Sequence, residues 1–125
     1  MRRLAFLLAP ALTMIALPGA SLAHTKLLSS FPAASTTVAK PTKLTLTFSE
    51  ALVGQLSGIE LVMTSMPGMA NHAPMPIKGF KTAADGKVLT VTLPRALPAG
   101  TYDLQWHAVA SDQHRVEGKF TFTVR

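Results

Sequence analysis

Potential ligands for a soft metal ion recur at every third position in one short segment of the chain. They are Met63, Met66, Met69, His72 and Met75. The chain has six methionines in all, and the other two, Met1 and Met14, lie in a leader that we expect to be removed. Thioethers are neutral, soft donors, which favour Cu(I) over zinc, calcium or magnesium. The residue types and their spacing therefore predict a Cu(I) site.

The alternative interpretation of this segment is packing, because methionine more often fills gaps in a hydrophobic core. A core segment should alternate or show a helical period, and Pro67, Gly68, Pro74 and Pro76 oppose both patterns. A repeat of three residues instead matches an extended, polyproline-like chain, which needs no packing partner. We therefore expect all five residues in one loop, as copper ligands.

The first 23 residues have the features of a secretory signal peptide. The basic pair Arg2-Arg3 precedes an apolar run, from Leu4 to Leu17, that is shorter than the roughly 20 residues that span a bilayer. Ser21-Leu22-Ala23 places small residues three positions and one position before a cleavage point. An uncleaved membrane anchor is the alternative. We expect residues 1–23 to be cleaved, which leaves a single domain, residues 24–125, in the periplasm with His24 as its N-terminus.

Composition narrows the function of that domain. Without Arg2 and Arg3 the formal net charge falls from +6 to about +4, and the remaining basic residues are scattered, which argues against nucleic-acid binding. The chain has no cysteine, so it has neither a disulfide framework nor a lipid-modified N-terminal cysteine, and methionine is its only sulfur ligand. No second apolar stretch is long enough for a transmembrane helix. We expect a soluble mature protein.

The rest of the chain alternates between apolar and polar residues with the period of β-strands, and Gly, Pro or Asp85-Gly86 signals bound each run. Seven strands are expected, at residues 26–30, 44–48, 59–63, 77–82, 89–93, 102–108 and 120–124. No window of useful length shows a helical period. Seven short strands in about a hundred residues predict an all-β fold, a Greek-key β-sandwich or barrel of the cupredoxin-like or immunoglobulin-like kind.

A second set of candidate ligands appears once His24 is the N-terminus. An N-terminal histidine offers both its α-amine and its imidazole to one metal ion. Asp112 and His114 are two residues apart, so in an extended segment their side chains would point to the same side, about 6.6 Å apart. Glu50, which follows the strand at 44–48, is a further oxygen donor. Nitrogen and oxygen ligands of this kind suit Cu(II).

These residues, in this order and spacing, resemble the CopC (PcoC) family of periplasmic copper-resistance proteins. The resemblance covers essentially the whole mature chain. It rests on His24-Thr-Lys26-Leu-Leu-Ser-Ser-Phe-Pro32, Phe48-Ser-Glu50, Met63-Thr-Ser-Met66-Pro-Gly-Met69, Gly100-Thr-Tyr102, Trp106 and Ser111-Asp112-Gln-His114. One departure is local, because the spacing from Met69 to His72 is one residue longer than the family pattern.

The resemblance implies a cupredoxin-like sandwich without blue-copper ligands, and copper carriage rather than catalysis. It implies Cu(II) ligands at His24, Asp112 and His114, with Glu50 nearby or ligating. It implies that the methionine segment with His72 forms a Cu(I) site. We expect copper to pass to an inner-membrane copper transporter or a periplasmic copper oxidase.

Two other classes of function remain open at this point. A histidine-brace copper oxygenase would also use an N-terminal histidine, but it should present an aromatic platform, and Tyr102 and Trp106 follow the inward-facing pattern. A plain immunoglobulin-like structural module would make the ligands coincidental. His107 follows Trp106, so we expect it on the opposite face of the strand, outside both metal sites. A hydrolase lacks support, because there is no Gly-x-Ser-x-Gly motif.

Overall fold

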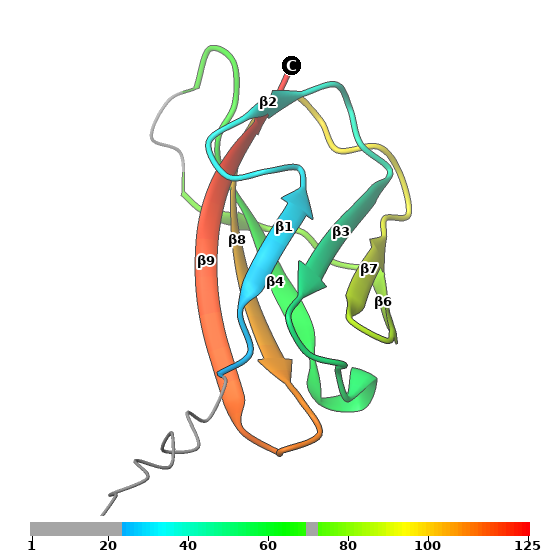
Figure 1. The fold of residues 1–125 in the computed structure, drawn as a ribbon. Helices are drawn as coiled ribbons and strands as arrows, with labels where there is room; N and C mark the ends of the chain where they lie inside the picture. Colours follow the sequence, from blue (N-terminus) through cyan, green and yellow to red (C-terminus); the bar gives the residue numbers. More distant parts are fainter. Residues whose placement is uncertain (1–23, 70–72) are drawn as a thin grey trace, which may run out of the picture.

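Nine strands form two sheets in the computed structural model, which describes residues 24–69 and 73–125 (Figure 1). One sheet has the strand order β1-β3-β7-β6, and the other has the order β2-β9-β8-β4-β5. The strands are β1 (Leu27–Phe31), β2 (Thr37–Val38), β3 (Lys43–Phe48), β4 (Gly58–Ser65), β5 (Met75–Pro76), β6 (Lys81–Asp85), β7 (Val88–Thr92), β8 (Gly100–Val109) and β9 (Arg115–Val124). A 3-10 turn, η1 (Gly54–Leu56), precedes β4.

The two sheets pack face to face as a β-sandwich, as the alternating pattern predicted. Along β3 the inward residues Leu44, Leu46 and Phe48 are fully buried, while the residues between them are partly exposed. Alternate residues of β8 fill the core from the other sheet. The ring of Phe48 meets that of Trp106 edge-on, with centroids 5.1 Å apart at 68°, a favoured geometry for aromatic pairs. The apolar core therefore lies between the sheets.

The seven longer strands correspond to the seven expected ones, with one displacement. The strand expected at 77–82 lies instead at Lys81–Asp85. Gly79 has a positive φ of 83°, which interrupts an extended chain, and the turn at Gly86 (φ 58°) sets the pairing of Asp85 with Val88. The two-residue strands β2 and β5 are too short to produce a periodic signal. β2 pairs in parallel with β9, and β5 pairs with β4 at the edge of the sheet.

β8 and β9 form a long hairpin that reaches from one end of the sandwich to the other. Their pairing extends from Gly100 with Val124 to Val109 with Arg115. β8 has ten residues, so its ends are about 30 Å apart at 3.3–3.4 Å per residue. Gly118 faces the indole of Trp106, and a Cβ there would lie only 2.9 Å from the indole nitrogen, so glycine allows this close contact. One end of this hairpin carries Asp112 and His114, and the other end adjoins Met66.

No helix in the described parts of the chain is long and apolar enough to cross a membrane.

Candidate metal centres

Asp112 and His114 face each other in the turn between β8 and β9. The expectation that Asp112-Gln113-His114 is extended is wrong, because Gln113 has a positive φ of 66° and its N–H donates to the carbonyl of Ala110 at 2.9 Å. The turn nevertheless brings the side chains together. His114 Nδ1 lies 3.4 Å from Asp112 Oδ2, and the His114 backbone N–H donates to Asp112 Oδ1 at 3.1 Å.

This contact brings an imidazole and a carboxylate together at the surface of the turn. Both are groups that copper accepts as ligands. Both side chains are exposed, at 57% for His114 and 42% for Asp112. An exposed pair of this kind contributes little to folding stability, so the arrangement suits ligand binding better than structural support.

His24 lies shortly before β1, which begins at Leu27, and the backbone that follows His24 is fixed. Its side chain is exposed, whereas Thr25 is buried. The N–H of Lys26 donates to Ser49 Oγ at 2.9 Å, and the N–H of Ser49 donates to the carbonyl of Lys26 at 2.9 Å. The segment that begins at His24 is therefore tethered, through Lys26, to the end of β3, where Glu50 follows.

The segment 49–53 connects His24 to the β8–β9 turn. Ser49 bonds to Lys26 at one end of the segment. At the other end Leu52 forms an isolated β-bridge with Ala110, and the N–H of Val53 donates to the carbonyl of Val109 at 2.8 Å. Glu50, which is half-buried, lies between these two attachments. The four candidate ligands His24, Glu50, Asp112 and His114 thus belong to segments that meet at one end of the sandwich.

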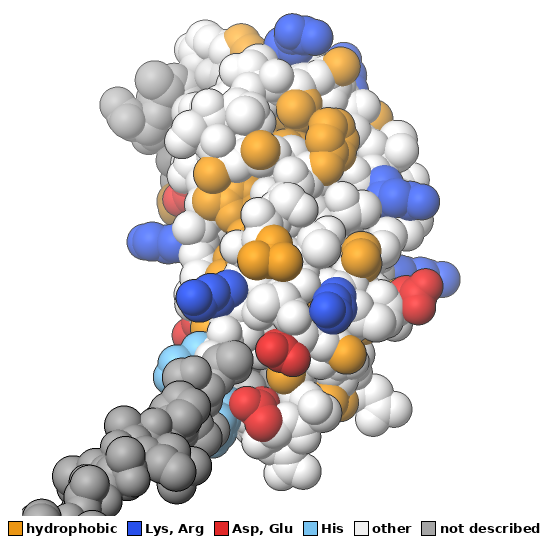
Figure 2. All heavy atoms as spheres, in the orientation of Figure 1, with side chains coloured by type: hydrophobic (Ala, Val, Ile, Leu, Met, Phe, Trp, Pro, Cys, Tyr) orange, Lys and Arg blue, Asp and Glu red, His pale blue; other side chains and the backbone are white. Residues whose placement is uncertain are grey.

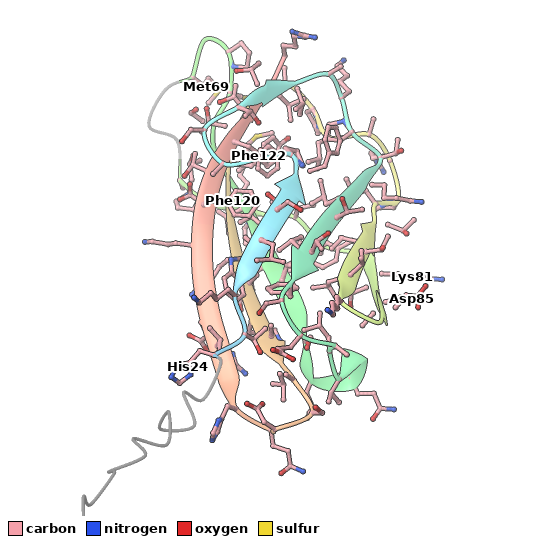
Figure 3. The ribbon with its side chains drawn as sticks, in the orientation of Figure 1. His24, Met69, Lys81, Asp85, Phe120 and Phe122 are labelled. Atoms are coloured by element: carbon pink, nitrogen blue, oxygen red, sulfur yellow. The ribbon has the colours of Figure 1, made fainter. Side chains whose placement is uncertain are left out.

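The space-filling view agrees with this placement. On the face shown in Figure 2, histidine side chains gather at the lower end with acidic side chains close by, while Lys and Arg are spread over the rest. Figure 3 places His24 at this same end. Among residues 24–69 and 73–125, however, no three His, Asp or Glu side chains already lie close enough to hold one metal ion. The ligands share an end of the molecule without forming a finished site.

The methionine segment is not one loop, which corrects the expectation from sequence. Met63 lies inside β4, with 3% of its surface exposed, and belongs to the hydrophobic core. The cause is pairing on both sides, since Met63 opposes Tyr102 of β8 and Met75 of β5. Its terminal methyl packs 3.3 Å from the position that a Cβ on Gly100 would take. Met63 therefore has a packing role that the threefold spacing concealed.

Met66 and Met69 close a tight turn rather than a polyproline-like segment. The N–H of Met69 donates to the carbonyl of Met66 at 3.0 Å, and the reverse bond is 3.4 Å. The central residues are Pro67 and Gly68, with Gly68 at φ 80°, as a type II turn requires. Residues that pair directly across a hairpin project to the same side, so the two thioethers share one face of the turn.

The methionines also differ in how much of their surface is exposed. Met69 and Met75 are 54% and 48% exposed, and Met66 is partly buried. His72 lies outside the described residues. Figure 3 places Met69 at the end of the sandwich opposite His24. A Cβ on Gly100 would be 3.5 Å from the Met66 Cα, so this turn adjoins the start of β8, about 30 Å from its other end. The two candidate sites are far apart.

His107 faces outward from β8, as expected from its position after the buried Trp106. It is on the outer face of β8, and its ring rests over Gly58, where an added Cβ would be 3.2 Å from His107 Cε1. Sequence reasoning missed the residues that join the ligand-bearing segments, Ser49 and Ser57. A serine beside a strand carries no periodic signal, so only the folded structure identifies them.

Comparison with known proteins adds an independent line of evidence. The family model described as the CopC domain matches residues 27–125. A Copper resistance protein C from Escherichia coli is 45% identical over 106 residues, which cover 84% of each chain. A protein of the same name from Pseudomonas syringae pv. tomato is 48% identical over 104 residues, which cover 82% of each chain. The crystal structure of PcoC, a methionine-rich copper resistance protein from Escherichia coli, matches 82% of this chain and 100% of its own, with 45% identity and a TM-score of 0.73.

Proposed function

This chain belongs to the CopC family, and from that premise we propose that it is a periplasmic copper-binding protein that carries copper for copper resistance or homeostasis. It holds Cu(II) at the end of the sandwich near His24 and Cu(I) at the opposite end, near Met69. The observation that carries this proposal is the placement of nitrogen and oxygen donors at one end and thioethers at the other. Ligands of different softness prefer different oxidation states of copper.

The Cu(II) site consists of His24, Asp112 and His114, with Glu50 as a further oxygen ligand. The facing pair Asp112 and His114 supplies one imidazole and one carboxylate. In the full chain the nitrogen of His24 is an amide, which is a poor donor. Cleavage after Ala23 converts it into an amine that chelates together with its own imidazole. Removal of the signal peptide therefore completes the site.

The Cu(I) site consists of Met66, Met69 and Met75, together with His72. The turn at Pro67-Gly68 presents two thioethers on one face, and β5 brings Met75 beside the same end of β4. Thioethers suit an oxidising compartment, because they do not form disulfides as thiolates would. Met63 supports this end from the core.

The protein acts as a carrier that passes copper to an inner-membrane copper transporter or a periplasmic copper oxidase. A histidine-brace oxygenase that attacks polysaccharide would need an aromatic platform beside its metal. Trp106 and Tyr102 are 7% and 0% exposed, so neither offers one. The geometry gives that alternative no support of its own.

Metal loading of the processed protein, beginning at His24, tests the proposal. We expect one Cu(II) per chain, with a nitrogen–oxygen electron paramagnetic resonance (EPR) signal, and one Cu(I) per chain, with copper–sulfur contacts in X-ray absorption. The reduced, copper-loaded protein should produce no oxidised sugar from polysaccharide with oxygen. Weak binding without fixed stoichiometry would overturn the carrier, and product formation would favour the oxygenase.

A further inference from the structure

Ser57 is a buried polar residue located where η1 meets β4. Only 6% of its surface is exposed, and within the described residues it shares this buried polar character only with Thr25. A buried hydroxyl is costly unless it is hydrogen-bonded. Its partners therefore indicate what the residue does.

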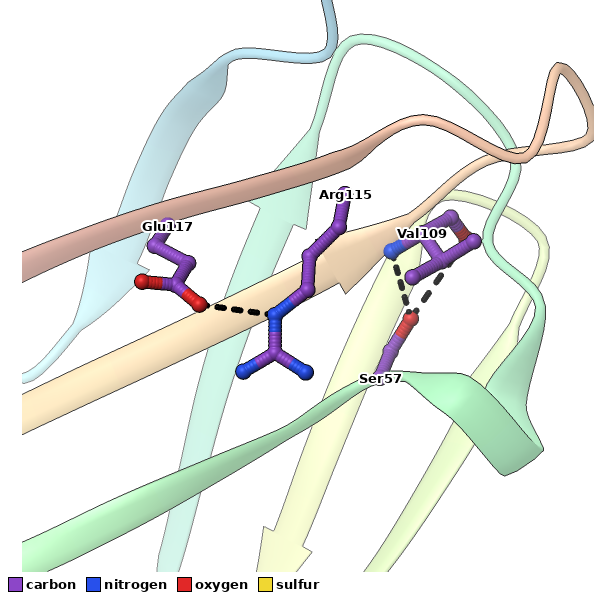
Figure 4. A network of polar contacts seen from close by, with 4 residues as sticks. All are labelled: Ser57, Val109, Arg115 and Glu117. Carbon is purple, nitrogen blue, oxygen red and sulfur yellow. Dashed lines mark hydrogen bonds and ion pairs between the residues drawn. The ribbon is translucent and has the colours of Figure 1, made fainter.

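The Ser57 hydroxyl bonds to two separate segments of backbone. It accepts the N–H of Val109 at 3.0 Å and donates to the carbonyl of Val53 at 2.9 Å. The Val109 carbonyl lies farther away, at 3.5 Å. Figure 4 shows the hydroxyl facing both backbone groups of Val109. One side chain thus joins the end of β8 to the segment that precedes η1.

Both of these segments lead to candidate Cu(II) ligands. Val109 ends β8 and opens the turn that contains Asp112 and His114. Val53 ends the segment that carries Glu50, and its own N–H donates to the Val109 carbonyl at 2.8 Å. The nearby Arg115 pairs with Glu117 at 2.7 Å, so its charge is directed along β9 (Figure 4).

We propose that Ser57 is a positioning residue for the Cu(II) site. Its hydroxyl holds Val53 and Val109 in a fixed relation, and so keeps the segment that carries Glu50 beside the turn that carries Asp112 and His114. This inference rests on the proposed Cu(II) site and deepens it. Ser57 does not touch the metal.

The backbone pairing of β4 and β8 explains why loss of the Ser57 hydroxyl should disturb only this end of the sandwich. These strands pair from Gly58 with His107 to Ser65 with Thr101, independently of the Ser57 side chain. Loss of the hydroxyl leaves the Val109 N–H without this partner and loosens the end of the hairpin. The sandwich itself and the distant methionine turn should remain.

The test compares two hydroxyl deletions on the same polypeptide segment. Ser57→Ala removes the proposed link. Thr64→Ala removes a hydroxyl near the other end of β4, where Thr64 Oγ1 donates to the Thr101 carbonyl at 3.3 Å. Ser57→Thr retains the hydroxyl. All three would be made in the processed protein, with Cu(II) and Cu(I) affinities measured by competition with chelators.

We expect Ser57→Ala to weaken Cu(II) binding by about 10- to 100-fold, the range typical of residues that orient metal ligands. Its Cu(I) affinity should stay at the wild-type level, its Cu(II) EPR lines should broaden, and its Val109 amide should exchange faster with solvent. Thr64→Ala and Ser57→Thr should bind Cu(II) like the wild type. A general loss of folded structure would instead weaken Cu(II) and Cu(I) binding together.

Equal Cu(II) affinity in Ser57→Ala and Thr64→Ala would overturn the positioning role while leaving the Cu(II) site intact. A wild-type protein that does not bind Cu(II) would instead overturn the proposed function. If Ser57→Ala does not fold, Ser57→Thr decides the question. In Ser57→Thr, wild-type Cu(II) affinity together with slow exchange of the Val109 amide would support the positioning role. A loss of Cu(II) affinity despite slow amide exchange would refute it.

Discussion

Met63 and Met75 are directly opposed residues of β4 and β5, yet their exposed fractions are 3% and 48%. The difference in exposure comes from the positions of their strands in the sheet. β4 lies between β8 and β5, whereas β5 is the edge strand of its sheet. An edge strand leaves one side open to solvent. Two chemically identical side chains thus differ in what they can do: Met63 packs in the core, and only Met75 is open to a metal ion.

The methionines should respond differently to replacement by leucine, which has similar volume and no sulfur lone pair. Replacing Met66, Met69 and Met75 together should weaken Cu(I) binding by more than about tenfold, or 1.4 kcal/mol. Met63→Leu should leave Cu(I) affinity unchanged and alter the free energy of unfolding by less than about 1.5 kcal/mol. Chelator competition and chemical unfolding measure the two effects. A large loss of Cu(I) affinity in Met63→Leu would show that its thioether leaves the core to bind metal.

One extra glycine before His24 should lower Cu(II) affinity by several orders of magnitude. The extension turns the terminal amine of His24 into an amide and removes the amine–imidazole chelate. Cu(I) affinity should not change, because the methionine turn lies at the other end of the sandwich. Titration of the extended and processed proteins provides the measurement. Equal Cu(II) affinities would exclude His24 as a chelating ligand.

His114→Ala should abolish tight Cu(II) binding and leave Cu(I) binding intact. His107→Ala is the matched control, because it removes an imidazole from the outer face of β8, where the ring lies beside Gly58 and not in the ligand-bearing turn. Isothermal titration with each ion distinguishes the two variants. The assignment fails if the His107 variant loses Cu(II) binding and the His114 variant retains it.

Reduction should move copper between molecules rather than within one molecule. The two sites adjoin opposite ends of β8, which are about 30 Å apart, too far for one ion to exchange ligands directly. Ascorbate added to Cu(II)-loaded protein should replace the EPR signal with copper–sulfur contacts. The rate at which the Cu(I) sites fill should rise with protein concentration. A rate independent of concentration would require an internal route.

Stability should fall in strongly alkaline solution because of Tyr102. Its hydroxyl donates to the Pro98 carbonyl at 2.6 Å, and burial raises its pKa from 10.0 to about 12. The folded state keeps this phenol protonated up to a higher pH than the unfolded state does. The phenol therefore contributes its full stabilisation below about pH 10. This contribution is lost as the pH rises from about 10 towards 12. Tyr102→Phe should be less stable at pH 8 and should lose less stability between pH 9 and pH 11.5, as followed by urea unfolding. Parallel losses in both proteins would assign the effect to other groups.

The order of the residues was enough to predict the β-sandwich, and it also supplied the chemical types of the candidate ligands. Alternation along Leu44, Leu46 and Phe48 is a property of neighbouring residues, and it indicates a strand with one buried face wherever that strand pairs. Ligand softness is likewise intrinsic to methionine and histidine. Both features can be recognised in the sequence without any knowledge of long-range contacts.

Tertiary structure alone decided which candidate ligands are accessible and which ligand-bearing segments meet. The spacing of the methionines was the same for Met63 as for Met69, but Met63 became core because β8 and β5 pair with β4 on either side. The approach of Glu50 to the β8–β9 turn depends on hydrogen bonds between residues far apart in the chain, such as Val53 with Val109. Local periodicity cannot encode such contacts, because burial depends on which distant strand covers a residue.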